Sequence, residues 1–354
     1  MRTVLLGMSG GVDSSAAAVL LLKAGFSVTG LFIRVLPSEF SETHLEDART
    51  TCSRLSIPLQ VLDKTESFRR EIIGYFTDAY RAGLTPNPCI RCNRLIKFGL
   101  LRETAFDLGI DFIATGHYAR IDEAGNGEIV LRRGMDKIKD QSYFLSAVPV
   151  KLLKGTLMVL GPLSKDNARA AASSAGLPVY GKSESQEICF VEGNDYRAFF
   201  KNHFPHLLKP GPILDISGGI IGEHTGVVNY TIGQRRGLGI SSREPLYVTA
   251  VDPSANTITV GGRDGCMHEV MTLEDVNWLA DPEGLSGLQP QVFHVKIRSL
   301  HEPAEASLAV SDSAVHVRFR EPQWAVTPGQ TAAFFHGDRV LGGGIIKSGG
   351  RSVI

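Results

Sequence analysis

Gly7-Met8-Ser9-Gly10-Gly11-Val12-Asp13-Ser14-Ser15 is the stretch of sequence that decides the fold of this chain. The apolar run Val4-Leu5-Leu6 before it is typical of a buried strand, and the alanine- and leucine-rich run 16–23 after it predicts a helix. A glycine-rich turn between a strand and a helix directs several backbone N–H groups to one place, so we expect an anion site there. Asp13 would repel phosphates unless it holds a magnesium ion that bridges them.

This turn is neither of the two most familiar phosphate loops. It lacks the lysine and the serine or threonine that end a Walker loop, and its glycines lack the spacing of the dinucleotide fingerprint. The string Ser9-Gly10-Gly11-Val12-Asp13-Ser14-Ser15 resembles the pyrophosphate loop of the ATP pyrophosphatases. That resemblance implies an enzyme that cleaves ATP between its α and β phosphates and adenylates a carbonyl oxygen. The simpler alternative is an ordinary glycine- and serine-rich turn.

Length and composition predict a globular chain of several domains. Its 354 residues exceed one typical core, so we expect two or three domains. A hydrophobic content of 43% with a charged content of 21% is typical of a soluble, folded protein. The chain starts in a strand-like run and has no apolar run of membrane-spanning length, so we expect a cytoplasmic protein without a membrane partner. Net charge is zero, so nucleic-acid binding would depend on local patches.

Strand and helix patterns alternate over residues 1 to about 190. Helices are expected to begin near residues 14, 42, 68 and 97, between strands at 3–6, 27–33, 59–62 and 112–114. This order predicts an α/β fold with a doubly wound parallel sheet, whose ligands lie at the carboxyl ends of the strands. The phosphate turn, the strand end at Ile33 and the run Ala114-Thr115-Gly116-His117-Tyr118 should then line one nucleotide pocket.

Short alternating runs separated by glycines replace this pattern after Lys209-Pro210-Gly211-Pro212. Such runs occur at 247–251, 257–260, 292–297, 315–319 and 331–335, and the last three predict a small β barrel. We therefore expect an ATP-pyrophosphatase-type catalytic domain at 1–195. A small central linking domain would follow at 196–265, and a C-terminal β barrel at 266–354.

The five cysteines are too few and too unevenly spaced for a structural disulfide framework. Cys52 lies in a helical pattern and is expected in the core, and Cys266 has no evident partner. Cys89 and Cys92 lie in the segment 85–93, whose prolines and asparagines predict a loop that enters a helix at Arg94.

The surroundings of Cys89 and Cys92 are basic. Five basic residues and no acidic residue occur from Arg81 to Arg102. We therefore expect lowered cysteine pKa values and a positive patch suited to a phosphate-bearing partner. Two simpler alternatives are a zinc half-site, although no second CxxC exists, and thioredoxin-like redox chemistry, which the nucleotide site does not favour.

Cys189 would by itself be interpreted as a buried core cysteine. Taken with the other motifs, it completes a pattern that resembles the tRNA-specific 2-thiouridylase family over nearly the whole chain. The matching motifs occur in one order, at residues 7–14, 30–32, 85–88, 92–98, 114–118, 139–145, 188–190, 221–224, 233–239, 326–330 and 341–346.

The resemblance implies three chemical steps. ATP with magnesium adenylates the C2 oxygen of the wobble uridine of tRNA, a cysteine persulfide delivers sulfur to C2, and AMP leaves. Cys189 would bear the persulfide, and Cys92 would be its nucleophilic partner. The sulfur donor would be a cysteine desulfurase, a sulfur-relay protein or sulfide. The implied nucleotide-binding residues are Gly7, Met8, Ser9, Gly10, Gly11, Val12, Asp13, Ser14, Ile33 and Gly116, and the implied tRNA-contacting residues are Asn87, Pro88, Lys139, Asp140, Gln141, Arg298 and Ser299.

Cys89 departs from the family pattern, because many members carry an aspartate at this position. That aspartate is a candidate general base, a role that a thiol fills poorly. Cys89, Cys92 and Cys189 instead form a candidate three-thiolate set, and three thiolates leave one iron of a cubane cluster open to external sulfide. The sequence leaves a persulfide relay and an iron–sulfur cluster both open, and Cys89 tips the interpretation toward the cluster.

Two other functions account for part of the pattern. Another adenylating enzyme with a pyrophosphate loop, such as an amidotransferase-type synthetase, would need ATP and Asp13 but not the cysteines. A tRNA-binding redox module without turnover would bind tRNA and release no pyrophosphate. Pyrophosphate release measured with and without tRNA separates these functions.

Overall fold

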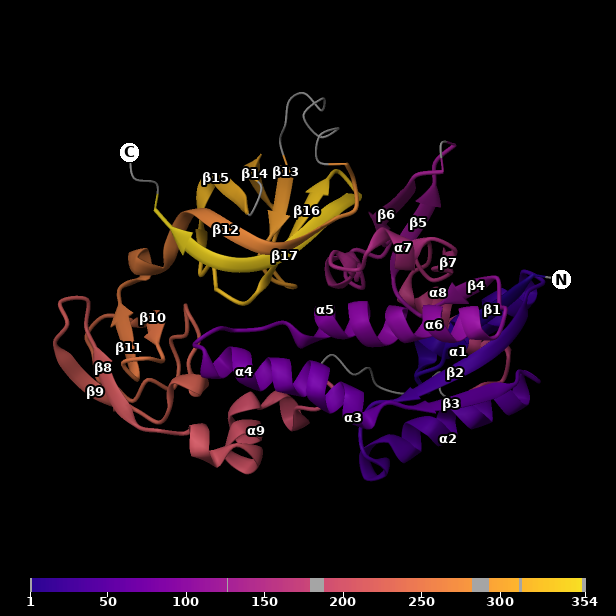
Figure 1. Cartoon of the computed structure of the whole chain (residues 1–354), viewed down its shortest axis with the longest axis horizontal. Coiled ribbons are helices and arrows are strands. Elements are labelled where there is room, and N and C mark those ends of the chain that lie inside the picture. Colours follow the sequence, from indigo (N-terminus) through magenta and orange to yellow (C-terminus); the bar gives the residue numbers. More distant parts are fainter. Residues whose placement is uncertain (1, 126, 179–187, 282–292, 312–313, 352–354) are drawn as a thin grey trace.

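The computed structural model of the chain describes residues 2–125, 127–178, 188–281, 293–311 and 314–351 (Figure 1). Its N-terminal part contains the predicted parallel sheet, with strand order β3-β2-β1-β4-β7 and parallel pairing throughout. The strands are β1 (Thr3–Gly7), β2 (Ser27–Arg34), β3 (Leu59–Asp63), β4 (Phe112–Ala114) and β7 (Thr156–Leu157). The four strands expected from the sequence are confirmed to within one residue at each end.

Helices cover both faces of this sheet, as the doubly wound prediction requires. Successive residues of β1 point to opposite faces, so Val4 and Leu6 enter one apolar cluster and Leu5 enters the other. The first cluster packs α1 (Val12–Lys23), α2 (Ser38–Arg54) and α8 (Lys165–Ser174), and the second packs α6 (Gly99–Asp107). Cys52 is buried in the first cluster, which confirms its expected place in the core.

Two long helical stretches cross the middle of the molecule beneath the barrel (Figure 1). One combines α3 (Thr65–Phe68), a π-helical stretch (Arg69–Gly74) and α4 (Tyr75–Arg81). The other combines α5 (Pro88–Cys92), a second π-helical stretch (Asn93–Phe98) and α6. The expected loop over residues 85–93 is therefore wrong at its end, because helix α5 begins at Pro88. Proline is favoured at the first helical position, where its missing N–H has no partner to lose.

The central region forms a separate four-stranded sheet with order β10-β11-β8-β9. Its strands are β8 (Gly211–Leu214), β9 (Ile220–His224), β10 (Tyr247–Asp252) and β11 (Thr257–Gly261), around a small apolar core that contains Ile213 and Val248. Helix α9 (Tyr196–His203) joins this region to the catalytic domain, because Phe199 and Phe200 pack against Phe76 of α4.

The C-terminal region is a closed antiparallel barrel, as predicted. Its strand order is β12-β15-β14-β13-β16-β17, and β12 pairs with β17 to close it. The strands are β12 (Met267–Trp278), β13 (Phe293–Lys296), β14 (Ala304–Val310), β15 (Val315–Trp324), β16 (Thr331–His336) and β17 (Arg339–Gly350).

A hairpin of the catalytic domain extends the barrel sheet, which the sequence analysis did not predict. It comprises β5 (Ala119–Glu123) and β6 (Ile129–Arg133), and Arg132 pairs with Arg339 of β17. The Asp338 carboxylate accepts from Arg120 at 2.6 Å and from Arg132 at 2.7 Å. These contacts fix the position of the barrel over the catalytic domain.

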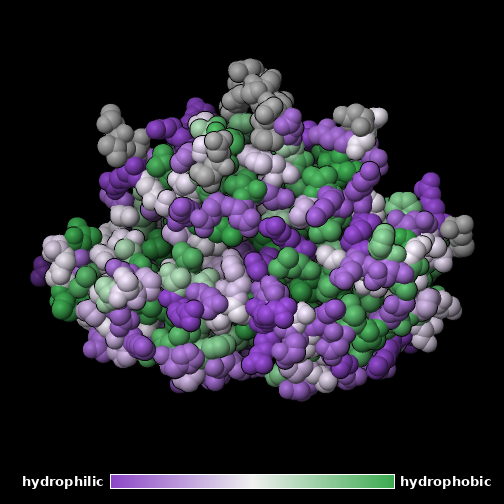
Figure 2. Space-filling model, in the orientation of Figure 1, coloured by the Kyte–Doolittle hydropathy of each residue, from purple (hydrophilic) through white to green (hydrophobic). Residues whose placement is uncertain are grey.

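The molecular surface is mixed in polarity, and Figure 2 shows hydrophilic side chains interspersed with apolar ones over the face seen there. Over the described ranges, no helix combines the length and the apolar character needed to cross a membrane.

Candidate active site

The glycine-rich turn connects β1 to α1 and is held by hydrogen bonds within itself. Ser14 Oγ accepts from the Ser9 backbone N–H at 3.2 Å and donates to the Gly11 carbonyl at 3.1 Å. Gly10 has a φ of +75°, and a Cβ at this position would lie 2.2 Å from the His44 carbonyl oxygen. Only glycine fits here, so the turn is preformed at the N-terminus of α1, where backbone N–H groups favour an anion.

The expected strand ends meet around this turn. The Met8 backbone N–H donates to the Leu31 carbonyl at 2.8 Å, which joins the start of the turn to β2. Val12 is buried in the apolar cluster behind the turn. Ile33 packs in the apolar cluster that contains Cys92, so this expected nucleotide residue lies toward the thiols.

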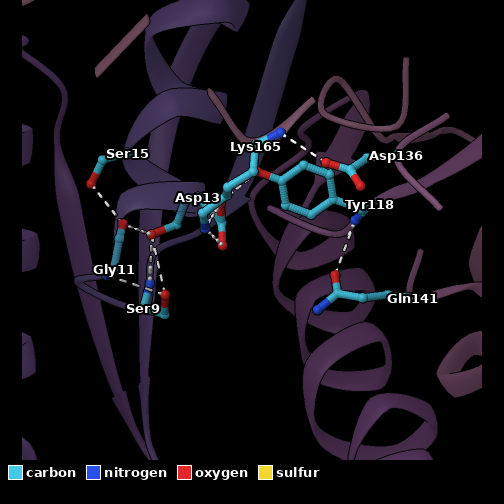
Figure 3. A network of polar contacts seen from close by, with 9 residues as sticks. Ser9, Gly11, Asp13, Ser15, Tyr118, Asp136, Gln141 and Lys165 are labelled. Atoms are coloured by element: carbon cyan, nitrogen blue, oxygen red, sulfur yellow. Dashed lines mark hydrogen bonds and ion pairs between the residues drawn. The ribbon is translucent and has the colours of Figure 1, made fainter. Parts of the chain in front are cut away.

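Asp13 is the centre of a charged network at the mouth of the turn (Figure 3). Lys165 Nζ lies 2.7 Å from one carboxylate oxygen of Asp13 and 2.9 Å from the other. The Tyr118 hydroxyl donates to Asp13 at 2.8 Å. Lys165 is 7% exposed, whereas the Asp13 side chain is one-third exposed, at 33%. The turn therefore carries one balanced ion pair that opens to solvent at the carboxylate.

Gly116 brings the end of β4 against the turn. A Cβ at Gly116 would lie 2.9 Å from both the Asp13 carbonyl carbon and the Ser14 nitrogen, which are backbone atoms that cannot rotate away. The predicted convergence of these two segments is therefore tight enough to require glycine.

We expect Gly116→Ala to displace the turn and to weaken ATP binding about tenfold or more, because overpacking of this kind costs roughly 1–3 kcal/mol. Isothermal titration with ATP, together with thermal unfolding, measures the effect. Gly125→Ala is the matched control, since its added Cβ meets no atom within 4 Å. Equal ATP affinity in Gly116→Ala and Gly125→Ala would contradict the tight packing.

The segment 136–141 braces this network from the other side. Gln141 accepts from the Tyr118 backbone N–H at 3.0 Å, and Asp136 accepts from the Lys165 backbone N–H at 3.1 Å (Figure 3). Asp140 accepts from the Gly134 backbone N–H at 3.0 Å. Asp140 and Gln141, expected as tRNA contacts, are thus also structural supports of the charged network.

Cys89 and Cys92 lie three residues apart on α5, so their side chains project from neighbouring positions of one helix face. Cys92 is buried and packs with Phe68, Ile72 and Ile96, whereas Cys89 is half-buried. All three thiols of the candidate site are free.

Cys189 is brought to this helix by the residue that follows it. Phe190 packs in the same apolar cluster as Cys92, and its ring lies edge-on to Phe68 at 5.9 Å. Cys189 itself is exposed. The thiols at 89, 92 and 189 therefore gather from segments about one hundred residues apart, with one thiol accessible from outside.

The expected lowering of the cysteine pKa values is wrong. Burial raises the pKa of Cys92 to about 11, and Lys97 only partly offsets it. Although Cys189 is exposed at the surface, many protein atoms surround its thiol, and this partial desolvation, followed by the two other thiols, raises its pKa. Burial also raises the pKa of Cys89. Nearby cations were expected to dominate, but Arg91 and Arg94 pair with carboxylates, and desolvation outweighs the single lysine.

This direction predicts the pH dependence of thiol reactivity. Below its pKa, the thiolate fraction of a cysteine rises tenfold per pH unit, so raised pKa values keep Cys92 and Cys189 mostly protonated at neutral pH. We expect their alkylation by iodoacetamide, followed by mass spectrometry, to accelerate steadily from pH 7 to pH 9. A free cysteine peptide, with a pKa of about 8.5, begins to level off over this range. A plateau near pH 7 would contradict the expectation.

The expected basic patch from Arg81 to Arg102 is largely neutralised. Arg81 pairs with Asp78 at 3.0 Å, Arg91 with Glu71 at 3.3 Å, and Arg94 with Asp275 at 3.3 Å. Arg102 donates to the carbonyl oxygens of Leu152 and Lys154. Lys97 is exposed, and its charge acts on all three thiols. Asp275 lies far from the basic run in the sequence, whereas Glu71 and Asp78 lie shortly before it, so a charge count confined to residues 81–102 overlooks all three partners.

The neutralised patch changes the expected effect of charge removal on RNA binding. We expect Lys97→Ala to reduce the slope of log affinity against log salt by about 0.7–0.9, the contribution of one phosphate contact. Arg91→Gln with Arg94→Gln should change the slope less, because both arginines already pair with carboxylates. Filter binding of tRNA between 50 and 200 mM salt tests this. A larger reduction of this slope in the double variant than in Lys97→Ala would show that the basic patch as a whole binds RNA phosphates.

One histidine joins the nucleotide turn to the thiols. His117 follows Gly116, and its ring centroid lies 5.6 Å from that of Phe98, beside Lys97 on the helix that carries the cysteines. Burial lowers the pKa of His117 to about 3, and it hydrogen-bonds to Thr115 Oγ1 at 2.8 Å. The buried, neutral His117 ring and Phe98 therefore lie between the nucleotide turn and the helical stretch that carries the cysteines, and we call this pair the neutral wall.

The remaining expected tRNA residues gather where the barrel meets the catalytic domain. Asn87 hydrogen-bonds to Tyr143, whose hydroxyl donates to the Thr331 carbonyl at 2.9 Å. Arg298 donates to the Trp324 carbonyl at 3.1 Å and is half-buried, and Ser299 follows it in a turn. Pro88 is buried and acts through the start of α5.

The sequence analysis missed several residues of this site. Lys165 holds Asp13 together with Tyr118, which was expected in the nucleotide pocket, and Lys296 Nζ lies 5.8 Å from the Tyr143 ring centroid. Lys165 did carry a signal, because a lysine in the first turn of a helix opposes the helix dipole. Gln330 also contributes, since its side chain donates to the Thr85 carbonyl at 3.0 Å and ties the barrel to the start of the cysteine helix.

Metal ligation was tested on the residues present. Across the described residues, no three histidine, cysteine, aspartate or glutamate side chains are placed to hold one metal ion. The three thiols are neighbours, but they are not arranged as a ready ligand set for a cluster. Asp13 is a single carboxylate at a phosphate turn, which is how magnesium is usually held together with nucleotide phosphates.

Comparison with known proteins agrees with this architecture. Residues 2–193 match the family model described as the tRNA methyl transferase HUP domain, residues 197–262 match the tRNA methyl transferase PRC-barrel domain, and residues 268–346 match the aminomethyltransferase beta-barrel domain.

Two relatives that match over nearly their full length share one name. A tRNA-specific 2-thiouridylase MnmA of Acidithiobacillus ferrooxidans is 43% identical over 98% of this chain and 98% of its own. The protein of that name from Acetivibrio thermocellus is 41% identical over 98% of this chain and 99% of its own. A solved structure, the U34-tRNA thiolase NcsA from Methanococcus maripaludis, is 20% identical over 57% of this chain and 67% of its own, with a TM-score of 0.36, a likeness too distant to support an argument. This chain belongs to the tRNA-specific 2-thiouridylase family.

Proposed function

We propose that this protein is a tRNA-uridine 2-sulfurtransferase that uses ATP to adenylate the C2 oxygen of the wobble uridine and then replaces that oxygen with sulfur. One observation carries the proposal: a preformed phosphate turn with a charged Asp13–Lys165 pair shares a wall with three free thiols. Family membership, at 40–43% identity over nearly the full length, supports the same activity.

The two halves of the site supply different steps. A uridine carbonyl oxygen is a poor leaving group, and adenylation converts it into one that departs with AMP. The phosphate turn would hold ATP for that step, and pyrophosphate would leave. Asp13 would hold a magnesium ion, which would supply neutralisation of phosphate charge.

The accessibility of the thiols suits a persulfide relay, in which sulfur passes through one exposed cysteine. Cys189 is exposed and can receive sulfur from a donor, whereas Cys92 is buried beside it. In the relay, the terminal sulfur of a Cys189 persulfide bonds to C2 as AMP leaves with the former oxygen. The Cys92 thiolate then attacks the inner sulfur, which forms a Cys92–Cys189 disulfide and frees 2-thiouridine. An external thiol must then reduce the disulfide by two electrons.

The remaining assignments extend this proposal. The tRNA would lie across the junction of barrel and catalytic domain, at Asn87, Pro88, Lys139, Arg298 and Ser299. The domains would divide at 1–195, 196–265 and 266–354. The protein would act in the cytoplasm, with a cysteine desulfurase, a sulfur-relay protein or sulfide as donor. The relay is proposed without an iron–sulfur cluster, and the Cys89→Ala comparison given in the Discussion distinguishes the two.

The deciding experiment measures pyrophosphate release and nucleosides together. Purified full-length protein with ATP and tRNA should release pyrophosphate only when tRNA is present, and tRNA from a strain lacking the protein should lose 2-thiouridine at the wobble position. A synthetase acting on another substrate would leave the nucleoside unchanged. A binding module would release no pyrophosphate under any condition. Either result would overturn the proposal.

A further inference from the structure

Lys165 is a buried lysine at a helix N-terminus, a position where its positive charge is unfavourable unless an anionic group pairs with it. It is the first residue of α8, where the positive end of the helix dipole disfavours a cation, and it is 7% exposed. Lysine is almost never buried unless it is paired. The Ser164 side chain caps the helix by accepting from Asn167, and Asp136 accepts from the Lys165 backbone N–H at 3.1 Å. The local structure therefore fixes an ammonium group at this point.

The ammonium is held directly beside the phosphate turn. Lys165 Nζ lies 2.7 Å and 2.9 Å from the two oxygens of Asp13, and 5.7 Å from the Tyr118 ring centroid (Figure 3). Asp13 lies within the first turn of α1, whose N-terminal N–H groups would receive the phosphates. A phosphate bound on this turn would therefore lie close to the Lys165 ammonium.

Charge balance shows why this contact matters. With Lys165, the Asp13–Lys165 pair is neutral, and without Lys165 the turn would carry the negative charge of Asp13 alone. A negative turn would repel the strongly anionic triphosphate. The pair is therefore suited to exchange its partner when ATP arrives, with the ammonium passing to a phosphate oxygen and the carboxylate becoming available to a bridging cation.

We propose that Lys165 is a catalytic residue that leaves Asp13 to donate to the phosphates of ATP and stabilises the charge that develops there as pyrophosphate departs. This inference rests on the proposed function for its catalytic part. Its binding part concerns only the chain and ATP, so the two can fail separately. No proton or electron is transferred in the exchange, because both groups keep their charge.

The test compares four full-length proteins that differ in the charge of the turn. Wild type and the double variant Asp13→Asn with Lys165→Met have a neutral pair, Asp13→Asn leaves a net positive charge, and Lys165→Met leaves a net negative one. ATP affinity is measured by isothermal titration in EDTA, so that no divalent cation contributes. Lys151→Met, an exposed lysine elsewhere, is the control for a loss of one surface charge.

If Lys165 contacts the phosphates, Asp13→Asn should bind ATP at least as tightly as wild type. Lys165→Met and the double variant should both bind about tenfold or more weakly, since a charged hydrogen bond contributes about 1.5–3 kcal/mol. If Lys165 only neutralises Asp13, the double variant should bind ATP like wild type, and this result would overturn the inference. Thermal unfolding confirms that each variant is folded, and Lys165→Arg, which keeps the cation, should recover part of the affinity.

The catalytic part has its own readout. Lys165→Met should lower kcat for tRNA-dependent pyrophosphate release about 100-fold to 1000-fold at saturating ATP, the usual effect of removing one preorganised charge from a transition state. Unchanged kcat with a raised KM would show that Lys165 only binds ATP, and would overturn its catalytic role. Absence of pyrophosphate release by wild type would refute the proposed function and leave the affinity comparison decisive for Lys165.

Discussion

Asp13→Asn protein is expected to lose tRNA-dependent pyrophosphate release by at least about 100-fold while it remains folded. Asparagine keeps the shape of the side chain and can still accept from Tyr118 and Lys165, so the network of Figure 3 should persist. It removes the carboxylate charge that would hold magnesium against the phosphates. Asp13→Ala should be equally inactive but less stable, because it removes the carboxylate that pairs with the buried Lys165 ammonium.

Pyrophosphate release with ATP, magnesium and tRNA measures the first of these effects, and thermal unfolding measures the second. Asp166→Asn, on an exposed carboxylate one residue from Lys165, is the matched control and should behave like wild type. Normal pyrophosphate release by a folded Asp13→Asn protein would remove Asp13 from the chemistry.

Loss of thiolation with retained adenylation is the second large effect. Cys92→Ala and Cys189→Ala proteins should form no detectable 2-thiouridine and should still release pyrophosphate with tRNA, because adenylation of the uridine oxygen by ATP requires no thiol. In a relay, Cys89→Ala should be milder, since the half-buried Cys89 is not part of the sulfur path. Nucleoside analysis of tRNA after reaction measures the outcome. Cys266→Ala, at a buried thiol that donates to the Val248 carbonyl, is the control.

Cys89→Ala separates the relay from the cluster that the sequence favoured. A cluster held by three thiolates should fail in all three variants, and anaerobically purified protein should then contain iron. A relay should leave substantial thiolation in Cys89→Ala and require no iron. Full loss in Cys89→Ala protein together with bound iron would refute the relay. Full thiolation by iron-free Cys89→Ala protein would refute the cluster.

The neutral wall between the two halves of the site has a chemical consequence. Burial lowers the pKa of His117 to about 3, which favours the neutral imidazole at neutral pH. The raised pKa values of the three cysteines likewise favour protonated thiols at neutral pH. The thiols are thereby kept protonated and weakly nucleophilic near the electrophile that adenylation by ATP would create.

Local sequence determined much of this protein. Glycines at 10 and 116 and the apolar runs around them specify the phosphate turn, because no other residue has the required backbone freedom or the required lack of a Cβ. Period-two alternation in the last hundred residues predicted the barrel, since one face of each strand must be buried. The order of motifs was enough to indicate the family.

Tertiary structure alone decided the charge and reactivity of the site. Lys165 pairs with Asp13 across 152 positions of the sequence, and Asp275 pairs with Arg94 across 181 positions. Neither pairing can be predicted from the residues on either side of these positions. The cysteine pKa values are raised, where the sequence predicted that they would be lowered. Burial causes this, and it depends on the packing of Phe190 and the π-helical stretch and not on basic residues nearby in the sequence. Charges act through space, whereas sequence motifs record only neighbours along the chain.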